Sequence, residues 1–227
     1  MSSKSGQQDR AARLAKSEQT RGRILDAARR LFNERGTAMV STNHIAAEAG
    51  LSPGNLYYHF AGKQEIVRGL HDQYAAANAG LWETVSGGPA SLAGLRAGLD
   101  RAMRLAWEYR FFERELVALL RADPRLRASY RQAYERRLGQ WREFAGQLAD
   151  QGIIRLPPSA AAADDLMTAI WLIGASWLPF LEITGDPQDA AQVARGADVV
   201  LAVLGPYLAR PDGTGETGRE GAGREQS

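Results

Sequence analysis

Residues 41–60 read STNHIAAEAGLSPGNLYYHF, and this stretch predicts two short helices joined by a tight turn. Ser41 and Ser52 each precede a helical segment, where a serine hydroxyl can accept an amide N–H of the first turn. Gly50 can adopt the left-handed conformation that ends the first of these helices. Pro53 suits the first position of the second helix, because the N–H that proline lacks would have no partner there. The stretch therefore predicts a helix-turn-helix.

Helical patterns also dominate the sequence on either side, and no stretch alternates as a strand would. Residues 20–36, TRGRILDAARRLFNERG, place apolar side chains on one helical face and end at a glycine. We expect residues 1–19 to form a disordered basic arm, and residues 210–227, which are almost free of apolar side chains, to form a disordered tail. The strongest break within the body is GGP at 87–89. Further helices are expected over 63–85, 90–109, 110–121, 124–151, 160–184 and 188–209.

Composition limits the class of protein. Charge is unevenly placed: residues 1–63 hold ten Lys or Arg against five Asp or Glu, whereas the remainder holds eighteen against twenty-one. This basic first quarter predicts either an anionic partner or a solvated tail. The chain has no cysteine, which rules out disulfides and thiolate metal sites and fits a reducing cytoplasm. The first twenty residues lack the apolar run of a signal peptide, so we expect a cytoplasmic protein.

The second helix of the motif carries residue types that suit contact with DNA. Gly54 has no Cβ and lets the backbone approach base edges, and Asn55 offers the donor and acceptor that read adenine in the major groove. Tyr57 and Lys63 can donate to phosphate oxygens, and Tyr58 can lie against a thymine methyl. The alternative is that the tyrosines are half-buried packing residues and the following histidine an ordinary surface residue.

Residues 40–66, VSTNHIAAEAGLSPGNLYYHFAGKQEI, closely resemble the N-terminal domain of the TetR family of bacterial transcriptional regulators, and the preceding helix extends the resemblance to residues 20–66. The shared pattern is an Ile-Ala pair, Ala-Gly, Ser-x-Gly, Leu-Tyr-x-His-Phe and a lysine. The resemblance implies an all-α fold, with a three-helix DNA-binding domain over 20–66 and a larger helical ligand-binding and dimerisation domain over 67–209. It also implies a double-stranded DNA operator, a homodimer and a small-molecule effector.

The resemblance assigns DNA contacts position by position. Thr42 and Asn43 match contacts from the first helix of the motif. Pro53, Gly54, Asn55 and Tyr58 match base contacts, whereas Tyr57, His59 and Lys63 match contacts to the DNA backbone. With the helix-capping Ser41 and Ser52, these residues form the expected DNA-binding set. Pro53 departs from the polar residue that often stands there, so one base contact is expected to be apolar or absent.

The segment DDLMTAIWLIGASWLPFLEIT, residues 164–184, is apolar nearly all round. It approaches the length of a membrane span, but its acidic residues and mid-segment proline argue against one, and no membrane partner is expected. A helix of this kind outside lipid must be covered on every side. The last helix and a second subunit would cover it in a four-helix interface; a purely intramolecular core is the alternative. The expected dimer interface comprises Leu166, Ile170, Trp171, Trp177, Leu178, Val193, Ala197, Val200, Leu201 and Leu204.

The middle helices are rich in aromatic rings, which suit the wall of a small-molecule pocket but also suit a plain core. The expected pocket residues are Met103, Trp107, Tyr109, Arg110, Phe111, Phe112, Tyr130, Tyr134, Trp141, Met167 and Trp171. Arg104, Arg110 and Arg131 could stand at its mouth. These features favour a flat or extended apolar ligand with at most one anionic end.

The sequence favours no enzyme, cofactor or metal site. It has no cysteine nucleophile and no glycine-rich phosphate loop, and His44, His59 and His71 do not form a metal-binding pair. We therefore expect a TetR-type regulator, a repressor that binds a palindromic operator as a homodimer and is released by a small apolar or amphipathic ligand. Two alternatives are a DNA-bound scaffold that recruits a protein partner without an effector, and a helical ligand carrier that no longer binds DNA.

Overall fold

The computed structural model describes residues 3–86 and 90–209, and over these residues the chain is helical, without a named strand. The expected tail at 210–227 and the break at 87–89 lie outside the described residues. The helix bounds agree with those predicted to within a few residues, except at the N-terminus. The helices are α1 Ser3–Arg35, α2 Thr42–Glu48, α3 Pro53–His59, α4 Lys63–Ser86, α5 Leu92–Glu108, α6 Arg110–Ala122, α7 Pro124–Asp150, α8 Ala160–Thr184 and α9 Ala190–Leu204, followed by a 3-10 turn, Gly205–Tyr207.

The caps predicted for α2 and α3 are present. Ser41 Oγ accepts the amide of His44 at 3.2 Å, and the His44 ring accepts the Ser41 amide at 3.3 Å, which makes a reciprocal capping box. Ser52 Oγ accepts the amide of Asn55 at 3.2 Å, with Pro53 at the start of α3. Gly50 closes α2 with a φ of 64°. The helix-turn-helix is therefore fixed by contacts within a few residues of each helix end.

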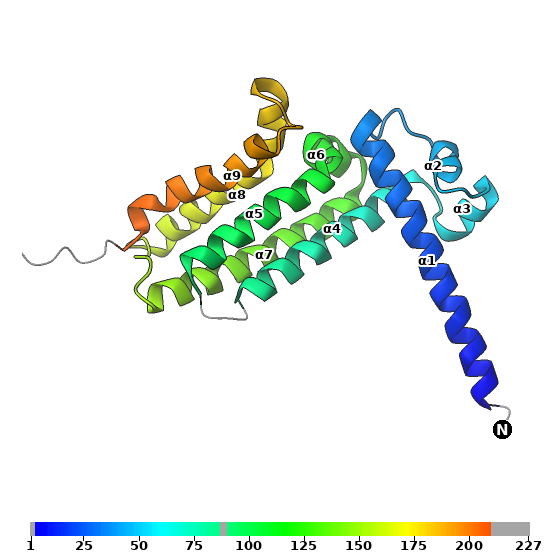
Figure 1. Cartoon of the computed structure of the whole chain (residues 1–227), viewed down its shortest axis with the longest axis horizontal. Helices are drawn as coiled ribbons and strands as arrows, with labels where there is room; N and C mark the ends of the chain where they lie inside the picture. The colour runs from blue at the N-terminus through cyan, green and yellow to red at the C-terminus, as the bar shows by residue number, and fades with distance from the viewer. Residues whose placement is uncertain (1–2, 87–89, 210–227) are drawn as a thin grey trace, which may run out of the picture.

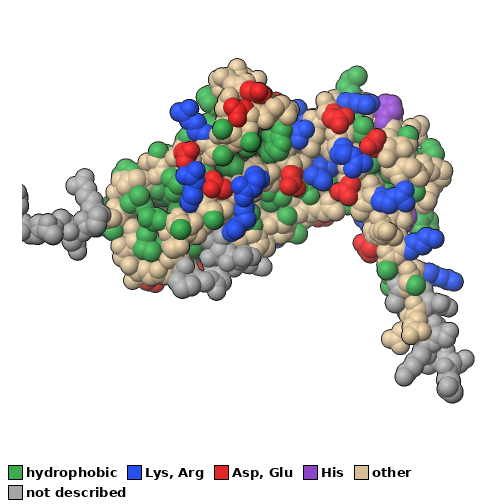
Figure 2. All heavy atoms as spheres, viewed as in Figure 1, with side chains coloured by type: hydrophobic (Ala, Val, Ile, Leu, Met, Phe, Trp, Pro, Cys, Tyr) green, Lys and Arg blue, Asp and Glu red, His purple; other side chains and the backbone are tan. Residues whose placement is uncertain are grey.

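The first helix differs from the expectation. In place of a disordered arm over residues 1–19, α1 begins at Ser3, and Figure 1 shows its N-terminal half projecting away from the rest of the molecule. Residues 10–19 are mostly good helix formers, and they continue a helix already anchored at its other end, so no new helix nucleus is needed. Arg10, Arg13 and Lys16 are exposed there, and Figure 2 shows basic side chains along this projection.

The core of the helix-turn-helix does not stop at residue 66. One buried cluster holds Ile45 of α2 and Leu56 of α3 together with Phe32 of α1 and Phe111 of α6. The rings of Phe32 and Phe111 lie 5.3 Å apart, centroid to centroid. Helix α4 begins beside α1 and runs into the body next to α7 (Figure 1). The expected boundary between residues 66 and 67 therefore falls inside a continuous helix and a continuous core.

The body is a bundle of α4 to α9, in which α8 and α9 pair and α5 packs against α9. Its second core cluster includes Leu99, Phe144, Ile170 and Val200. Among the described helices, α8 is the one long and apolar enough to cross a membrane, and only 17% of its most apolar stretch is buried within this chain. Much of α8 therefore remains uncovered by the protomer itself.

Candidate DNA-binding surface and effector cavity

The outer surface of α2 and α3 presents the residues expected to contact DNA. Asn43, Pro53 and Asn55 are exposed. A Cβ placed on Gly54 would meet no atom within 4 Å, so this backbone is open to solvent. Tyr58 is 83% exposed, an unusual position for a large aromatic ring. The side chains at the N-terminal end of α3 are therefore free to reach a groove.

Tyr57 joins the two helices of the motif. Its hydroxyl lies 2.9 Å from Thr42 Oγ1 in a hydrogen bond in which either atom can donate. Thr42 is partly buried and Tyr57 half exposed, and Ser41 and Ser52, which cap the two helices, are exposed beside them. The two hydroxyls thus form one polar point at the meeting of α2 and α3, where a phosphate oxygen could replace their mutual bond.

The end of α3 is held by α1. Arg21 donates through Nη1 to the carbonyl of His59 at 2.6 Å, and its guanidinium carbon lies 4.1 Å from the centroid of the Phe60 ring. The rings of Tyr58 and His59 meet edge to face at 5.1 Å. A partly buried arginine of the first helix therefore sets where the recognition helix ends.

Lys63, expected to contact the DNA backbone, makes two hydrogen bonds within the protein. Its ammonium donates to the carbonyls of Thr37 at 2.7 Å and Val40 at 3.0 Å, and the residue is partly buried. These carbonyls belong to the loop between α1 and α2, so the lysine fastens the start of α4 to that loop. The sequence showed the charge of Lys63 but not the carbonyl oxygens that surround it.

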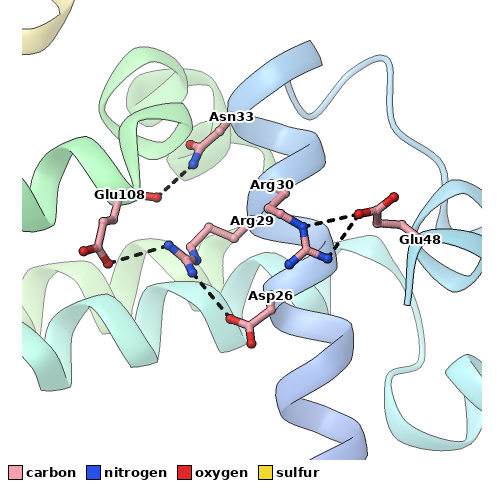
Figure 3. Close-up of polar contacts among 6 residues, drawn as sticks. All are labelled: Asp26, Arg29, Arg30, Asn33, Glu48 and Glu108. Atoms are coloured by element: carbon pink, nitrogen blue, oxygen red, sulfur yellow. Dashed lines mark hydrogen bonds and ion pairs between the residues drawn. The ribbon is translucent and has the colours of Figure 1, made fainter. Parts of the chain in front are cut away.

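Side chains of α1 also connect the helix-turn-helix to the body (Figure 3). Asn33 donates to the carbonyl of Glu108 at 2.8 Å and accepts the amide of Phe111 at 3.0 Å. Arg29 forms an ion pair with the Glu108 carboxylate at 3.6 Å, and Arg30 reaches Glu48 of α2 at 3.1 Å. One face of α1 is thus bonded to the α5–α6 junction while another holds α2.

Three consecutive residues of α6, Glu113 to Glu115, connect the cavity in the body with the end of α1. Arg114 donates to the carbonyl of Asn33 at 2.7 Å. Glu115 accepts the amide of Thr37 at 3.0 Å and also its hydroxyl. The residue before them, Glu113, lines a cavity in the body. A displacement of α6 at the cavity would therefore reach the end of α1 directly.

This cavity lies among α4, α5, α6, α7, α8 and α9 and encloses about 80 Å³. Its walls are mainly apolar and aromatic, which is typical of small-molecule sites. It is lined by Tyr74, Asn78, Leu99, Ala102, Met103, Ala106, Glu113, Tyr130, Arg137, Leu138, Trp141, Met167, Ile170, Trp171, Gly174, Ala175 and Val200.

A few polar groups stand among these walls. The Tyr74 hydroxyl donates to Glu113 Oε1 at 2.8 Å. Burial raises the pKa of the Glu113 carboxyl above its ordinary value, although this hydrogen bond and the charge of Arg137 act in the other direction. Burial and the neighbouring Glu113 raise the pKa of Tyr130 to about 12. The Arg137 guanidinium carbon lies 4.7 Å from the centroid of the Trp171 ring.

The structure separates the expected pocket residues into two groups. Met103, Tyr130, Trp141, Met167 and Trp171 line the cavity, whereas the remainder lie outside it. Phe111 and Phe112 are fully buried core residues, Tyr109 stacks on Tyr74, Trp107 packs beside Arg110, and Tyr134 meets Trp171 edge to face. Periodicity identified rings that are buried but could not say which of them border an unfilled space.

The expected arginines do not line the cavity either. Arg104 and Arg131 are exposed, and Arg110 donates to the carbonyl of Trp107 at 3.2 Å. The sequence analysis missed the polar lining residues Tyr74, Asn78, Glu113 and Arg137. One available signal was the spacing of Tyr74 and Asn78, four residues apart on one helical face that is otherwise rich in small apolar residues.

A second cavity of about 230 Å³ adjoins the first, with Trp141, Met167 and Ile170 bordering both. Its walls are more apolar than those of the first cavity, with Phe144, Leu148 and Leu166 among them. Together the two spaces make this end of the bundle loosely filled compared with ordinary protein interiors.

Most of the residues expected at a dimer interface pack inside the protomer. Ile170, Leu178, Val193, Ala197, Val200 and Leu204 are buried in the single chain. Trp177 donates through Nε1 to carbonyls of Gln192 and Val193, and Leu166, Trp171 and Leu201 are partly buried within the body. Within the protomer, α9 and α5 cover that face of α8, and the opposite face stays exposed.

The uncovered face of α8 carries Leu172, Phe180 and Ile183, of which Ile183 is 85% exposed. Their spacing along the helix keeps them close to one side. Exposed apolar residues aligned in this way mark an interaction surface more often than scattered ones do.

Among the described residues, no group of three or more His, Asp or Glu side chains is placed to hold a metal ion.

Two family models cover most of the chain. Residues 24–70 match the bacterial regulatory proteins of the tetR family, and residues 73–213 match a model described as bacterial transcriptional repressor. The chain belongs to the TetR family. It is thus a transcriptional regulator of a DNA-binding, non-enzymatic class.

Individual TetR-family proteins show where the similarity lies. The regulator UidR of Escherichia coli K12 is 42% identical over 59 residues, which are 25% of this chain and 30% of UidR. A TetR-family regulator from Marinobacter aquaeolei VT8 is 34% identical, with a TM-score of 0.72 over 83% of this chain and 90% of its own. A protein from Saccharomonospora viridis, in complex with choline, shares the fold at 21% identity and a TM-score of 0.68, covering 85% and 99%.

Proposed function

We propose that this TetR-family regulator is a homodimeric repressor that binds a palindromic operator and is released by a small apolar or amphipathic effector. The observation that carries the proposal is that α4 and α6 line the cavity and also hold the helix-turn-helix. Tyr74 and Glu113 border the cavity, whereas Lys63 and Arg114 of the same two helices bond to the ends and loops of α1.

The exposed surface of α2 and α3 supports the DNA contacts. We assign base reading to Asn55 and Tyr58, with close backbone approach at Gly54. Tyr57 and Thr42 donate to phosphate, and His59 is near the same backbone path. Arg10, Arg13 and Lys16 on the projecting half of α1 add positive charge to this end of the molecule.

The exposed apolar face of α8 supports the homodimer. Two copies of this face, packed across a twofold axis, would cover Leu172, Phe180 and Ile183 and complete a bundle of two α8 and two α9 helices. A twofold dimer places two recognition helices at successive major grooves, which matches a palindromic operator.

Release would follow from a shift between two states. An effector that fits the cavity only when α4 and α6 have moved apart stabilises that arrangement, and the same movement displaces the recognition helices. The family-model description as a repressor and the choline held by a protein of the same fold are consistent with this role. A cytoplasmic location follows from a partner that is genomic DNA.

The test is selection of bound fragments from genomic DNA with the full-length protein, followed by measured affinities for the recovered sites. We expect a pseudo-palindrome and an affinity that falls steeply with salt. Asn55→Ala should cost about 1–3 kcal/mol at one base pair of each half-site, whereas Gln132→Ala, exposed on α7, should change nothing. Recovery of no enriched sequence would overturn the proposal.

A further inference from the structure

The wall of the cavity contains a hydrogen-bond acceptor that the protein itself leaves unmatched. Asn78 is 2% exposed, and its side-chain oxygen Oδ1 has no hydrogen-bond partner. A buried acceptor without a partner costs free energy, so such an atom in a folded protein needs an explanation. Because Asn78 also borders the cavity, a ligand that donates a hydrogen bond is an explanation that the site allows.

A carboxylate lines the same cavity as this amide. Asn78 follows Tyr74 by four residues on α4, which puts both on the same face of the helix. The Tyr74 hydroxyl is bonded to Glu113 at 2.8 Å, and Tyr74, Asn78 and Glu113 all border the cavity. Among the described residues, no basic side chain forms an ion pair with Glu113, although the charge of Arg137 acts on it at longer range.

Aromatic rings complete the surroundings. Tyr130, Trp141 and Trp171 line the same space, and the faces of such rings attract a cation. Arg137 lies on the Trp171 ring, whereas the Asn78 oxygen has no hydrogen-bond partner. A ligand group that donates a hydrogen bond would therefore satisfy an acceptor that the protein leaves open.

We propose that the effector of this cavity is a protonated primary or secondary amine with a compact apolar or aromatic body, bound through its N–H groups to the Glu113 carboxylate and the Asn78 oxygen. This inference rests on the proposed function, because it assumes that the cavity is the effector site. The proposed effector thus carries a cationic group, where the arginine content of the sequence suggested an anionic one.

Two properties of the cavity narrow the chemical class of the effector. A volume of about 80 Å³ admits a small body, and a larger one would extend into the adjoining space beyond Trp141 and Met167. The Asn78 oxygen can accept from an N–H or an O–H donor, and a quaternary ammonium has neither. A primary or secondary amine therefore satisfies both acceptors, while a trimethylammonium satisfies the charge of Glu113 alone.

The test uses four probes with one phenyl body: 2-phenylethylamine, its N,N,N-trimethyl derivative, 2-phenylethanol and 3-phenylpropionate. Binding to the full-length protein is followed by tryptophan fluorescence, since Trp141 and Trp171 line the cavity, and by calorimetry. We expect the primary amine to bind at least tenfold more tightly than the alcohol or the acid. Glu113→Gln should weaken amine binding at least tenfold, whereas Glu135→Gln, exposed on α7, should leave it unchanged.

Asn78→Leu provides the second variant and removes the unmatched oxygen without leaving another polar group. We expect it to abolish the preference for the primary amine over its trimethyl derivative while the protein keeps its fold, monitored by circular dichroism. If 3-phenylpropionate binds more tightly than the primary amine, and Arg137→Met abolishes that binding, the proposal is overturned in favour of an anionic ligand. Equal binding of all four probes, no binding of the amine, or full amine binding to Glu113→Gln would also overturn it.

Operator release is measured separately, with the same amine and the operator recovered by selection. Amine binding that leaves operator affinity unchanged would contradict the proposed induction but keep the ligand assignment. If the protein binds its operator but binds none of the amines, the ligand assignment is contradicted and the DNA-binding function still stands. The two proposals therefore fail in different experiments.

Discussion

Asn33 Oδ1 accepts the backbone N–H of Phe111 at 3.0 Å, while its Nδ2 donates to the carbonyl of Glu108 at 2.8 Å. One side chain of α1 thus satisfies a backbone donor and a backbone acceptor where α5 ends and α6 begins. The amide of Phe111 is in the first turn of α6, where no helical carbonyl is available to it. The asparagine acts as a cap supplied by a distant part of the chain.

Asn33→Ala should lower the free energy of unfolding by about 1–3 kcal/mol, because it leaves the Phe111 amide and the Glu108 carbonyl without partners in a buried place. Urea denaturation measures this loss, with Asn43→Ala, exposed on α2, as the matched control. Equal stability of the two variants would show that water replaces both bonds and that the contact does not fasten α1 to the body.

Lys63→Met should lower stability by about 1–2 kcal/mol, since the carbonyls of Thr37 and Val40 lose a charged donor. The salt dependence of operator binding should keep its slope, because the ammonium is already occupied within the protein. A phosphate contact would instead reduce that slope by about one. A smaller slope with unchanged stability would restore the role that sequence alone assigned to this lysine.

Ile183→Glu should dissociate the proposed dimer and weaken operator binding, with little loss of protomer stability, because this side chain is 85% exposed. Sedimentation velocity measures the dimer. Met39→Glu is the control, since Met39 is 72% exposed on the loop between α1 and α2, far along the chain from α8. A dimer that survives Ile183→Glu and Phe180→Glu would move the interface to another surface.

Glu113→Gln should stabilise the protein at neutral pH. Burial raises the pKa of Glu113 in the folded state, so its charged form is disfavoured by folding. This penalty is full above the folded-state pKa and disappears as the pH falls below the ordinary value of 4.5. The melting temperature of the variant should thus exceed that of the parent near pH 8 and approach it near pH 4. A difference that does not vary with pH would contradict an ionised, buried Glu113.

The parts of this molecule that could be predicted from sequence are those fixed by contacts between residues a few positions apart in the chain. The caps of α2 and α3 depend on Ser41 and Ser52 and on the next helical turn, and they are present as predicted. The cavity is different, because Asn78 and Glu113 come from separate helices and border the same space only through packing. Periodicity alone could not reveal an unfilled space.

The same limit explains the interface residues and Lys63. Apolar periodicity showed that Leu178 and Val200 avoid water, but not that α5 and the α8–α9 pairing bury them within the protomer. The charge of Lys63 was visible in sequence, whereas the two loop carbonyls that bind it depend on where the turn after Gly36 leads the chain. Periodicity and charge along the sequence therefore could not show where the protein supplies its own partner.

The continuous core around Phe32 and Phe111 has a practical consequence for building hybrid sensors. A chimera that joins this helix-turn-helix to another regulator's body at residue 66 would cut through α4 and separate rings that pack against each other. A transplant that keeps this core intact must carry α6 and the first turns of α7 along with α1 to α4. The exchangeable part is then the far end of the bundle with α8 and α9, and the cavity would be shared between the two parents.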